Sequence, residues 1–199
     1  MKNNPIYHRK AGEGTMIFRF NVMKTIQAAA VLLKAESPHR LSRLRLLKLL
    51  YIADRSLLQQ RARSITGDRP VAMDHGPVLT GTYELLKGEA YFSPQWEQYI
   101  QNEGRDAVLK SEPGVGELSR YEIAKLHEVA ARFRDCNDWE VAEFTHTFPE
   151  WVKNQPKKGT CKAIPIEDIL SATGILELRD KLALDTEAEA AAARLFGAA

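Results

Sequence analysis

The segment Ser42–Arg61 constrains the fold most, because its apolar side chains cover more than half of a helix. They recur at three- and four-residue spacing, which predicts an α-helix. A helix that is apolar over most of its circumference has to be buried on most sides. We therefore expect one helical domain built around this segment. The stripe consists of Leu46, Leu49, Leu50, Ala53 and Leu57, widened by Leu44, Leu47, Tyr51 and Leu58.

Composition agrees with a single globular domain. The chain has 199 residues, of which 44% are hydrophobic and 27% charged, enough apolar material for a core. The formal net charge of +2 does not indicate a dedicated polyanion binder. Charge is uneven, however: residues 40–69 contain eight basic side chains, opposed by Asp54 and Asp68. This is either a solvated helix face or a basic surface for an acidic partner.

The cysteines and the hydropathy of the chain indicate its localisation and its domain limits. Cys136 and Cys161 lie far apart and outside any CxxC pair, which favours reduced thiols. The first residues lack the apolar core of a secretory signal, and no run approaches the ~20 apolar residues of a membrane span. We expect a cytoplasmic protein with a tail over 1–20, one domain over 21–175 and a helix or tail over 176–199. Translation could begin at Met1, Met16 or Met23.

The first half of the chain predicts two helices and a connector. A helix over 22–34 ends before Ser37-Pro38. The connector, 64–77, begins with a turn at Thr66-Gly67-Asp68 and continues as a short extended run over 71–73. Gly76-Pro77 is expected to open the next helix, since proline suits the first helical position. The apolar side of this next helix includes Tyr83, and Gly88 is the position at which the helix is expected to end.

The second half predicts a small β element among further helices. Short apolar runs over 89–118 indicate a β-hairpin or an irregular flap. Ser119 and Glu122 have the spacing of a capping box, which opens a helix over 120–133. A helix over 139–148 is expected to end at Pro149, and Ile164-Pro165-Ile166 precedes another helix that contains Ile169 and Leu170. The predicted fold class is therefore mainly α, a single compact helical domain with a small β-hairpin or flap, α+β at most.

Few residues offer chemistry. No histidine pair has the HxxxH or HExxH spacing of a zinc site, and nothing resembles a nucleophile elbow or a phosphate loop. We expect no enzyme, metal or cofactor. His75-Gly76-Pro77 could hold an anion or only shape a helix entrance, and His146 is expected to bridge helix and loop. Asp54 lies at the edge of the apolar stripe and, if buried, should bind the connector.

A DNA-binding alternative stays open at this stage. The two helices separated by Ser37-Pro38, with Arg40, Arg43 and Arg45 at the start of the second, loosely resemble a helix-turn-helix. The second helix is rich in leucine, which does not suit a recognition helix exposed in a groove. A transcriptional regulator of its own operon is thus the rival hypothesis.

Four segments together resemble the Panacea domain, a family of bacterial antitoxins that includes SocA-type protease adaptors. They read KLLYIADR, ITGD, HGPV and EFTHTFPEW, the last over 143–151. The resemblance spans roughly 24–170 and is strongest over 46–88.

The resemblance implies a non-enzymatic antitoxin that binds a toxin encoded beside it. It further implies possible delivery of the toxin to a ClpXP-type protease and occurrence in prophage regions. Nucleic acid is a secondary candidate partner, a homo-oligomer is open, and no membrane partner is expected. The candidate partner-binding or motif residues are Tyr51, Asp54, Arg55, Thr66, Gly67, Asp68, His75, Gly76, Pro77, Tyr83, His146 and Trp151.

Overall fold

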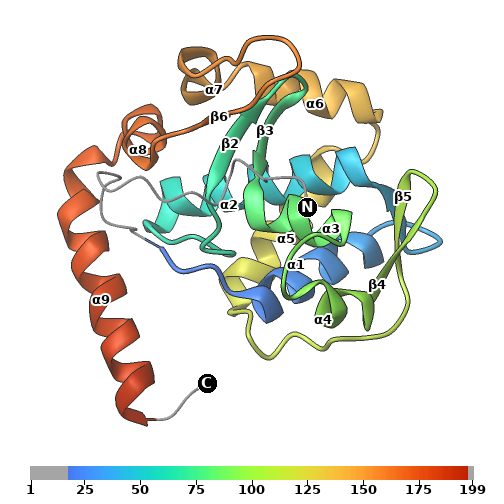
Figure 1. The fold of residues 1–199 in the computed structure, drawn as a ribbon, viewed down its shortest axis with the longest axis horizontal. Helices are drawn as coiled ribbons and strands as arrows, with labels where there is room; N and C mark the ends of the chain where they lie inside the picture. Colours follow the sequence, from blue (N-terminus) through green and yellow to red (C-terminus); the bar gives the residue numbers. More distant parts are fainter. Residues whose placement is uncertain (1–17, 197–199) are drawn as a thin grey trace.

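The computed structural model describes residues 18–196, and helices account for most of them, packed around the long helix α2 (Figure 1). Two small antiparallel sheets complete the fold. The expected mainly helical class with a small β element is confirmed. The helices are α1 (Val22–Lys34), α2 (Arg43–Arg61), α3 (Thr80–Lys87), α4 (Ser93–Glu97), α5 (Arg120–Arg132), α6 (Asp138–His146), α7 (Pro149–Lys153), α8 (Ile166–Thr173) and α9 (Arg179–Phe196), with a 3-10 turn η1 (Leu176–Leu178).

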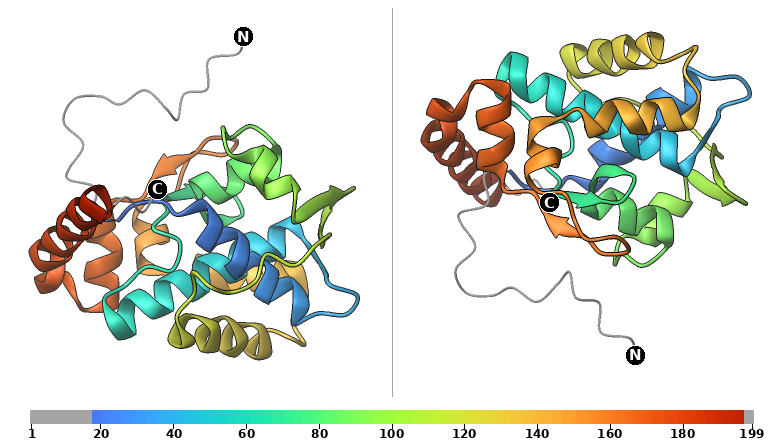
Figure 2. Two further views of the ribbon diagram at one scale, coloured as in Figure 1. Left: turned by 90° about the horizontal axis from the view of Figure 1, so that it is seen from below. Right: turned by 90° about the horizontal axis from the view of Figure 1, so that it is seen from above.

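Helix α2 is the centre of the core, as its apolar stripe predicts. Ser42 caps it, because its hydroxyl accepts a hydrogen bond from the Arg45 N–H at 3.0 Å,. Ala62 ends it with a left-handed backbone, φ +52°. Helices α1, α5, α6 and α8 and the strand β3 (Gly76–Leu79) all contact α2, and the views from below and above show it enclosed between them (Figure 2). The leucines of α2 from Leu46 to Leu58 are therefore buried.

The first sheet has the order β1-β5-β4, formed by β1 (Arg40–Ser42), β4 (Ile100–Glu103) and β5 (Asp106–Leu109). Strands β4 and β5 form the hairpin expected within 89–118, with a tight turn at Gly104, φ +61°. The short helix α4 precedes it and was not expected. Its Trp96 is buried, so this segment contributes to the core as well as to the sheet.

The second sheet has the order β3-β2-β6, formed by β2 (Pro70–Met73), β3 and β6 (Lys162–Ala163). Strands β2 and β3 form a hairpin in which Val71 pairs with Val78 and Ala72 with Pro77. The prediction that Gly76-Pro77 opens a helix is therefore wrong. Both residues belong to β3, and α3 begins at Thr80.

The physical reason lies in the position of β3 at the edge of its sheet. Proline lacks a backbone N–H and is tolerated on an edge strand, where that group would face outward. The Pro77 carbonyl points away from β2 and accepts a hydrogen bond from Lys48 Nζ at 2.8 Å. Helix α3 begins after this strand, at Thr80. It ends at Gly88, whose φ is +72°, and this end was expected from the sequence.

Of the later helices, α5 agrees with the sequence, whereas α6 is shorter than expected and α7 was not expected. Ser119 and Glu122 form the expected capping box of α5. Helix α6 ends at His146 rather than at Phe148, and Pro149 opens α7 at the position that proline favours,.

Helix α9 lies along one side of the body, where Leu182 packs into the core (Figures 1 and 2). Across residues 18–196, no helix combines the length and the hydropathy needed to cross a bilayer.

Candidate functional site

The connector after α2 is fastened to that helix by Asp54. This carboxylate is buried, and it accepts hydrogen bonds from the Ser64 hydroxyl at 2.8 Å, from the Ile65 N–H at 2.5 Å and from the Thr66 hydroxyl. Burial raises the pKa of Asp54, while these hydrogen bonds oppose the rise,. The expectation that Asp54 binds the connector is confirmed.

The turn at Thr66-Gly67-Asp68 joins three parts of the chain. The Thr66 carbonyl accepts a hydrogen bond from the Asn21 N–H at 2.9 Å. A Cβ on Gly67, which has φ +66°, would lie 1.9 Å from the Arg19 carbonyl oxygen. The segment before α1 thus lies directly on this turn, and glycine is required for that close approach.

Asp68 caps helix α3 from outside the helix. Its carboxylate accepts hydrogen bonds from the Gly81 and Thr82 N–H groups, each at 2.8 Å, and from the Thr82 hydroxyl at 2.9 Å. The residue before α3, Leu79, has no side chain that can do this. Burial raises the pKa of Asp68, and the same hydrogen bonds oppose it. A carboxylate at a helix N-terminus also interacts favourably with the helix dipole.

A fully buried lysine lies behind the tip of the β2–β3 hairpin. Lys48 Nζ donates to the Pro77 carbonyl, and burial lowers the pKa of Lys48 from 10.5 to about 7. Gly76 has φ +93°, and a Cβ there would lie 2.3 Å from Thr145 Oγ1 and 3.1 Å from Lys48 Nζ. The glycine therefore lets β3 approach α6 and α2 closely.

A second buried charge group joins α2 to α7. Glu150 accepts hydrogen bonds from Arg55 Nε at 2.6 Å and from the Tyr51 hydroxyl at 3.0 Å. The Arg55 guanidinium also lies 4.2 Å from the centre of the Phe148 ring. Burial and the nearby Glu150 carboxylate raise the pKa of Tyr51 well above 10. Tyr51 and Arg55 are thus bound within the protein.

His146 and Trp151 form the wall between α6, α7 and the hairpin. Their rings stack with centroids 4.1 Å apart, and Trp151 Nε1 donates to the Met73 carbonyl at 3.1 Å. Burial, with the nearby Lys48 charge, lowers the pKa of His146. Its Nε2 is buried without a hydrogen-bond partner among the described residues. His146 is the last residue of α6, and its ring packs on Trp151 of α7.

Two of the candidate residues are more accessible. Tyr83 on α3 is half-buried, with Lys87 Nζ 5.3 Å from its ring centre. His75 lies at the exposed tip of the hairpin, and its ring meets the edge of Trp139 at 5.2 Å. Of the twelve candidates, His75 alone falls in the exposed class.

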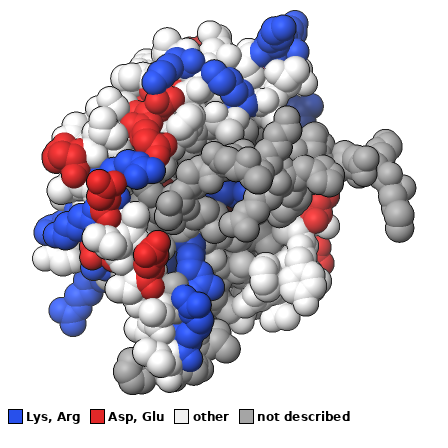
Figure 3. Space-filling view, turned by 60° about the vertical axis from the view of Figure 1, so that its left-hand side comes forward, with Lys and Arg blue, Asp and Glu red and all other residues white. Residues whose placement is uncertain are grey.

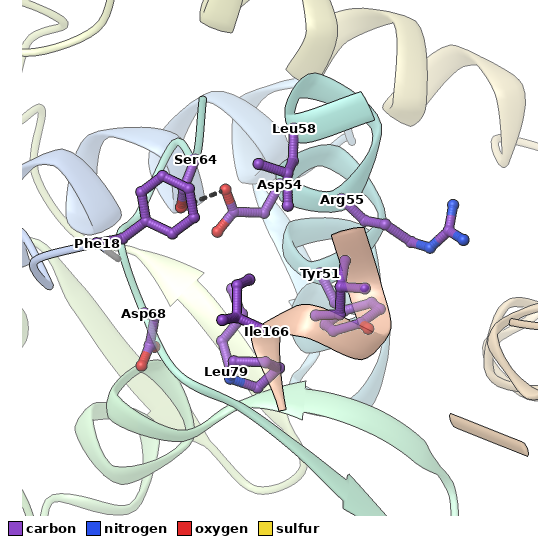
Figure 4. Close-up of a pocket in the computed structure, with 11 residues that line it drawn as sticks. Phe18, Tyr51, Asp54, Arg55, Leu58, Ser64, Asp68, Leu79 and Ile166 are labelled. Atoms are coloured by element: carbon purple, nitrogen blue, oxygen red, sulfur yellow. Dashed lines mark hydrogen bonds between the residues drawn. The ribbon is translucent and has the colours of Figure 1, made fainter. Parts of the chain in front are cut away.

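A small pocket opens beside this network, between α2, the connector and α8 (Figure 4). Tyr51 and Asp54 lie on its α2 side, and Phe18 and Ile166 close it. Its cavity of about 30 Å³ has room for a water molecule or two rather than for an organic ligand. Its carboxylates are already bound to protein groups, so it offers no free group for chemistry.

The basic run over 40–69 is also largely used within the fold. The Arg45 guanidinium donates to the Phe133 carbonyl at 2.6 Å and to the Cys136 carbonyl at 2.5 Å, and Lys48 and Arg55 are bound as described. On the face that carries α8 and α9, acidic and basic side chains are interspersed over the described surface (Figure 3). Neither observation favours a broad basic surface.

These observations define a class of protein. Within residues 18–196 there is no group of three or more histidine, cysteine or acidic side chains that could hold a metal ion. The four sequence segments come together in space, and their polar groups bind one another. The polar groups of these segments thus hold the helical scaffold together.

The chain belongs to the family of SocA-like antitoxins with a Panacea domain. The family model matches residues 46–152, which is more than half of the chain. The resemblance based on the four segments is thereby confirmed, over a shorter range than the 24–170 expected. Comparison with curated proteins and with solved structures gives no significant match.

Sequence reasoning missed Lys48 and Glu150. Both are charged residues beside apolar ones on helices, and their partners lie on other elements. For Lys48 the sequence did contain a local signal of burial. Lys48 lies inside a run of leucines, and a helix that is apolar on most sides leaves little solvent-exposed face for a charged residue.

Proposed function

We propose that this protein is an antitoxin that neutralises a cognate protein toxin by direct binding. The observation that carries the proposal is the match to SocA-like antitoxins over 46–152. Its support in the structure is that three carboxylates of the motif segments, Asp54, Asp68 and Glu150, are each held by hydrogen bonds from protein groups. A scaffold of this kind acts through the shape and charge of its surface.

The fold argues against the rival hypothesis of a regulator that binds DNA through α2. A recognition helix has to lie exposed in the major groove. Here β1 separates α1 from α2, Arg45 binds backbone carbonyls, and most of α2 is buried. A gel shift at low salt tests this directly, since binding through phosphate contacts weakens steeply as salt rises.

The test of the antitoxin proposal is co-expression with the product of the adjacent reading frame. We expect that product to arrest growth alone, and this chain to restore growth and to co-purify with it. Leu50→Asp is the matched negative control, because it places an unpaired charge in the core and should unfold the protein,. A harmless neighbour that does not co-purify would refute the proposal.

Two modes of neutralisation remain to be separated once a toxin is in hand. Delivery to a ClpXP-type protease predicts that the toxin's half-life shortens when this chain is present and recovers when the protease is deleted. Steric blocking predicts a stable toxin in an inactive complex, with or without the protease. A pulse-chase measurement of toxin level distinguishes the two.

A further inference from the structure

The tip of the β2–β3 hairpin gathers exposed groups from three separate segments. His75 lies at the tip, and Trp139 at the start of α6 contacts its ring. The loop between α7 and β6 passes over the same tip (Figure 1), where the Gly159 N–H donates to the Asp74 carboxylate at 2.7 Å. We call His75, Trp139 and the loop residues 155–163 the tip patch.

Trp139 is an exposed but well-supported aromatic side chain. It is 59% exposed, in contrast to Trp96 and Trp151, which are buried. The first turn of α6 on which it lies is fixed by a capping box between Asn137 and Glu140. Its position is thus set before any partner arrives, which lowers the entropic cost of binding.

The loop residues 155–163 supply positive charge. They include Lys157, Lys158 and Lys162 and no acidic residue, and all three lysines are exposed. No ion pair involving Lys157 or Lys158 exists among the residues that the structure describes. A turn fixes the loop, because the Thr160 N–H donates to the Lys157 carbonyl at 3.0 Å.

Acidic groups also lie near the patch, and a hydrogen bond from a backbone N–H leaves their negative charge in place. Asp74 is bound to Gly159, and Glu140 accepts a hydrogen bond from the Asn137 N–H at 2.6 Å. Asp138 and Glu143 belong to α6, on the Trp139 side of the patch. Every charged side chain within residues 155–163 is therefore basic, whereas the acidic side chains belong to Asp74 and to α6, which carries Trp139.

We propose that the tip patch is the docking site for the toxin, and that it binds an acidic segment whose apolar side chain packs on Trp139. This inference rests on the proposed antitoxin function. Tryptophan is enriched among residues that dominate binding energy, and complementary charge at the rim steers association. The carboxylates of the partner segment face Lys157 and Lys158.

The experiment uses the full chain and the co-purifying product of the adjacent reading frame. Trp139→Ala and the double variant Lys157→Glu/Lys158→Glu are each titrated against it. Tyr121→Ala and Lys110→Glu are the matched controls, since Tyr121 is a 63% exposed aromatic residue on α5 and Lys110 an exposed lysine on another loop. Thermal unfolding of each variant establishes that it folds.

We expect each tip variant to weaken binding at least tenfold and each control to change it less than threefold. The affinity of the unchanged chain should also fall with added salt, and that fall should be smaller in the charge-reversed variant.

Tryptophan fluorescence gives a second readout in the same complex. Because Trp96 and Trp151 are buried, Trp139 should account for most of the emission that acrylamide can quench. We expect the partner to protect this emission from quenching.

Three results would overturn the inference, each in a recognisable way. A complex that forms with the unchanged chain and equally with the tip variants refutes the docking site and leaves the antitoxin function intact. The absence of any complex with the unchanged chain withdraws both proposals. Binding of DNA, lost in the charge-reversed variant, would assign the basic loop to nucleic acid instead.

Discussion

Replacing Lys48 by methionine should stabilise the protein at neutral pH, and the gain should shrink as pH rises. Lys48 is fully buried, and its pKa falls from 10.5 in the unfolded chain to about 7 in the native state. The unfolded state therefore binds more protons between these two values, and stability increases with pH across that range. Methionine has a similar length and no charge.

The magnitude follows from the two pKa values. At about 1.4 kcal/mol per pKa unit, keeping Lys48 buried costs about 4 kcal/mol at pH 7 and about 2 kcal/mol at pH 9. Methionine removes this cost, but it leaves the Pro77 carbonyl without its hydrogen bond, a loss of roughly 1–3 kcal/mol,. The net gain at pH 7 is about 1–3 kcal/mol, and it should fall by about 2 kcal/mol between pH 7 and pH 9.

Chemical denaturation of both proteins at pH 7, 8 and 9 measures this difference. Lys110→Met, at an exposed lysine, controls for the loss of one positive charge. A Lys48→Met difference that stays constant over these pH values would refute the reasoning, because it would mean that Lys48 keeps its charge at no cost. Measuring the difference between variants cancels the titration of groups far from Lys48.

Three further substitutions test the network around the connector. Gly76→Ala should lower the unfolding free energy by roughly 2 kcal/mol or more, since its Cβ would clash with Thr145,; Gly114→Ala, also at positive φ but in open space, should cost less. Asp54→Ala should lower it by roughly 3 kcal/mol or more, because three donors lose their acceptor,; a thermal shift below a few degrees would contradict this. Asp68→Ala should cost about 1–2 kcal/mol and speed amide exchange at the start of α3,; full protection there would contradict the capping role.

Helices and their ends were predictable where the signal is local. The stripe within Ser42–Arg61, the capping box at Ser119 and the glycine at Gly88 each act within a few residues. Such signals need no knowledge of the rest of the chain. The buried position of α2 was predictable for the same reason, since a helix apolar on nearly all sides has one stable environment.

The strand at Gly76–Leu79 was not predictable from local rules. Gly-Pro before an apolar run is equally consistent with a helix start and with an edge strand. Two distant partners favour the strand over the helix. Strand β2 pairs with β3, and Lys48 on α2 binds the Pro77 carbonyl. The same holds for Glu150, whose partners lie about a hundred residues earlier.

The structure separates the residues that make the scaffold from those available to a partner. Asp54, Asp68 and Gly76 are engaged inside the protein, so folding accounts for these three residues of the motif segments. The basic loop over 155–163 lies outside the matched range of 46–152. Family membership therefore covers the scaffold together with His75 and Trp139 of the tip patch, whereas the lysines of the patch lie outside the matched range. On the proposed function, we expect a chain with the same scaffold and a different loop to fold alike and to bind a different toxin.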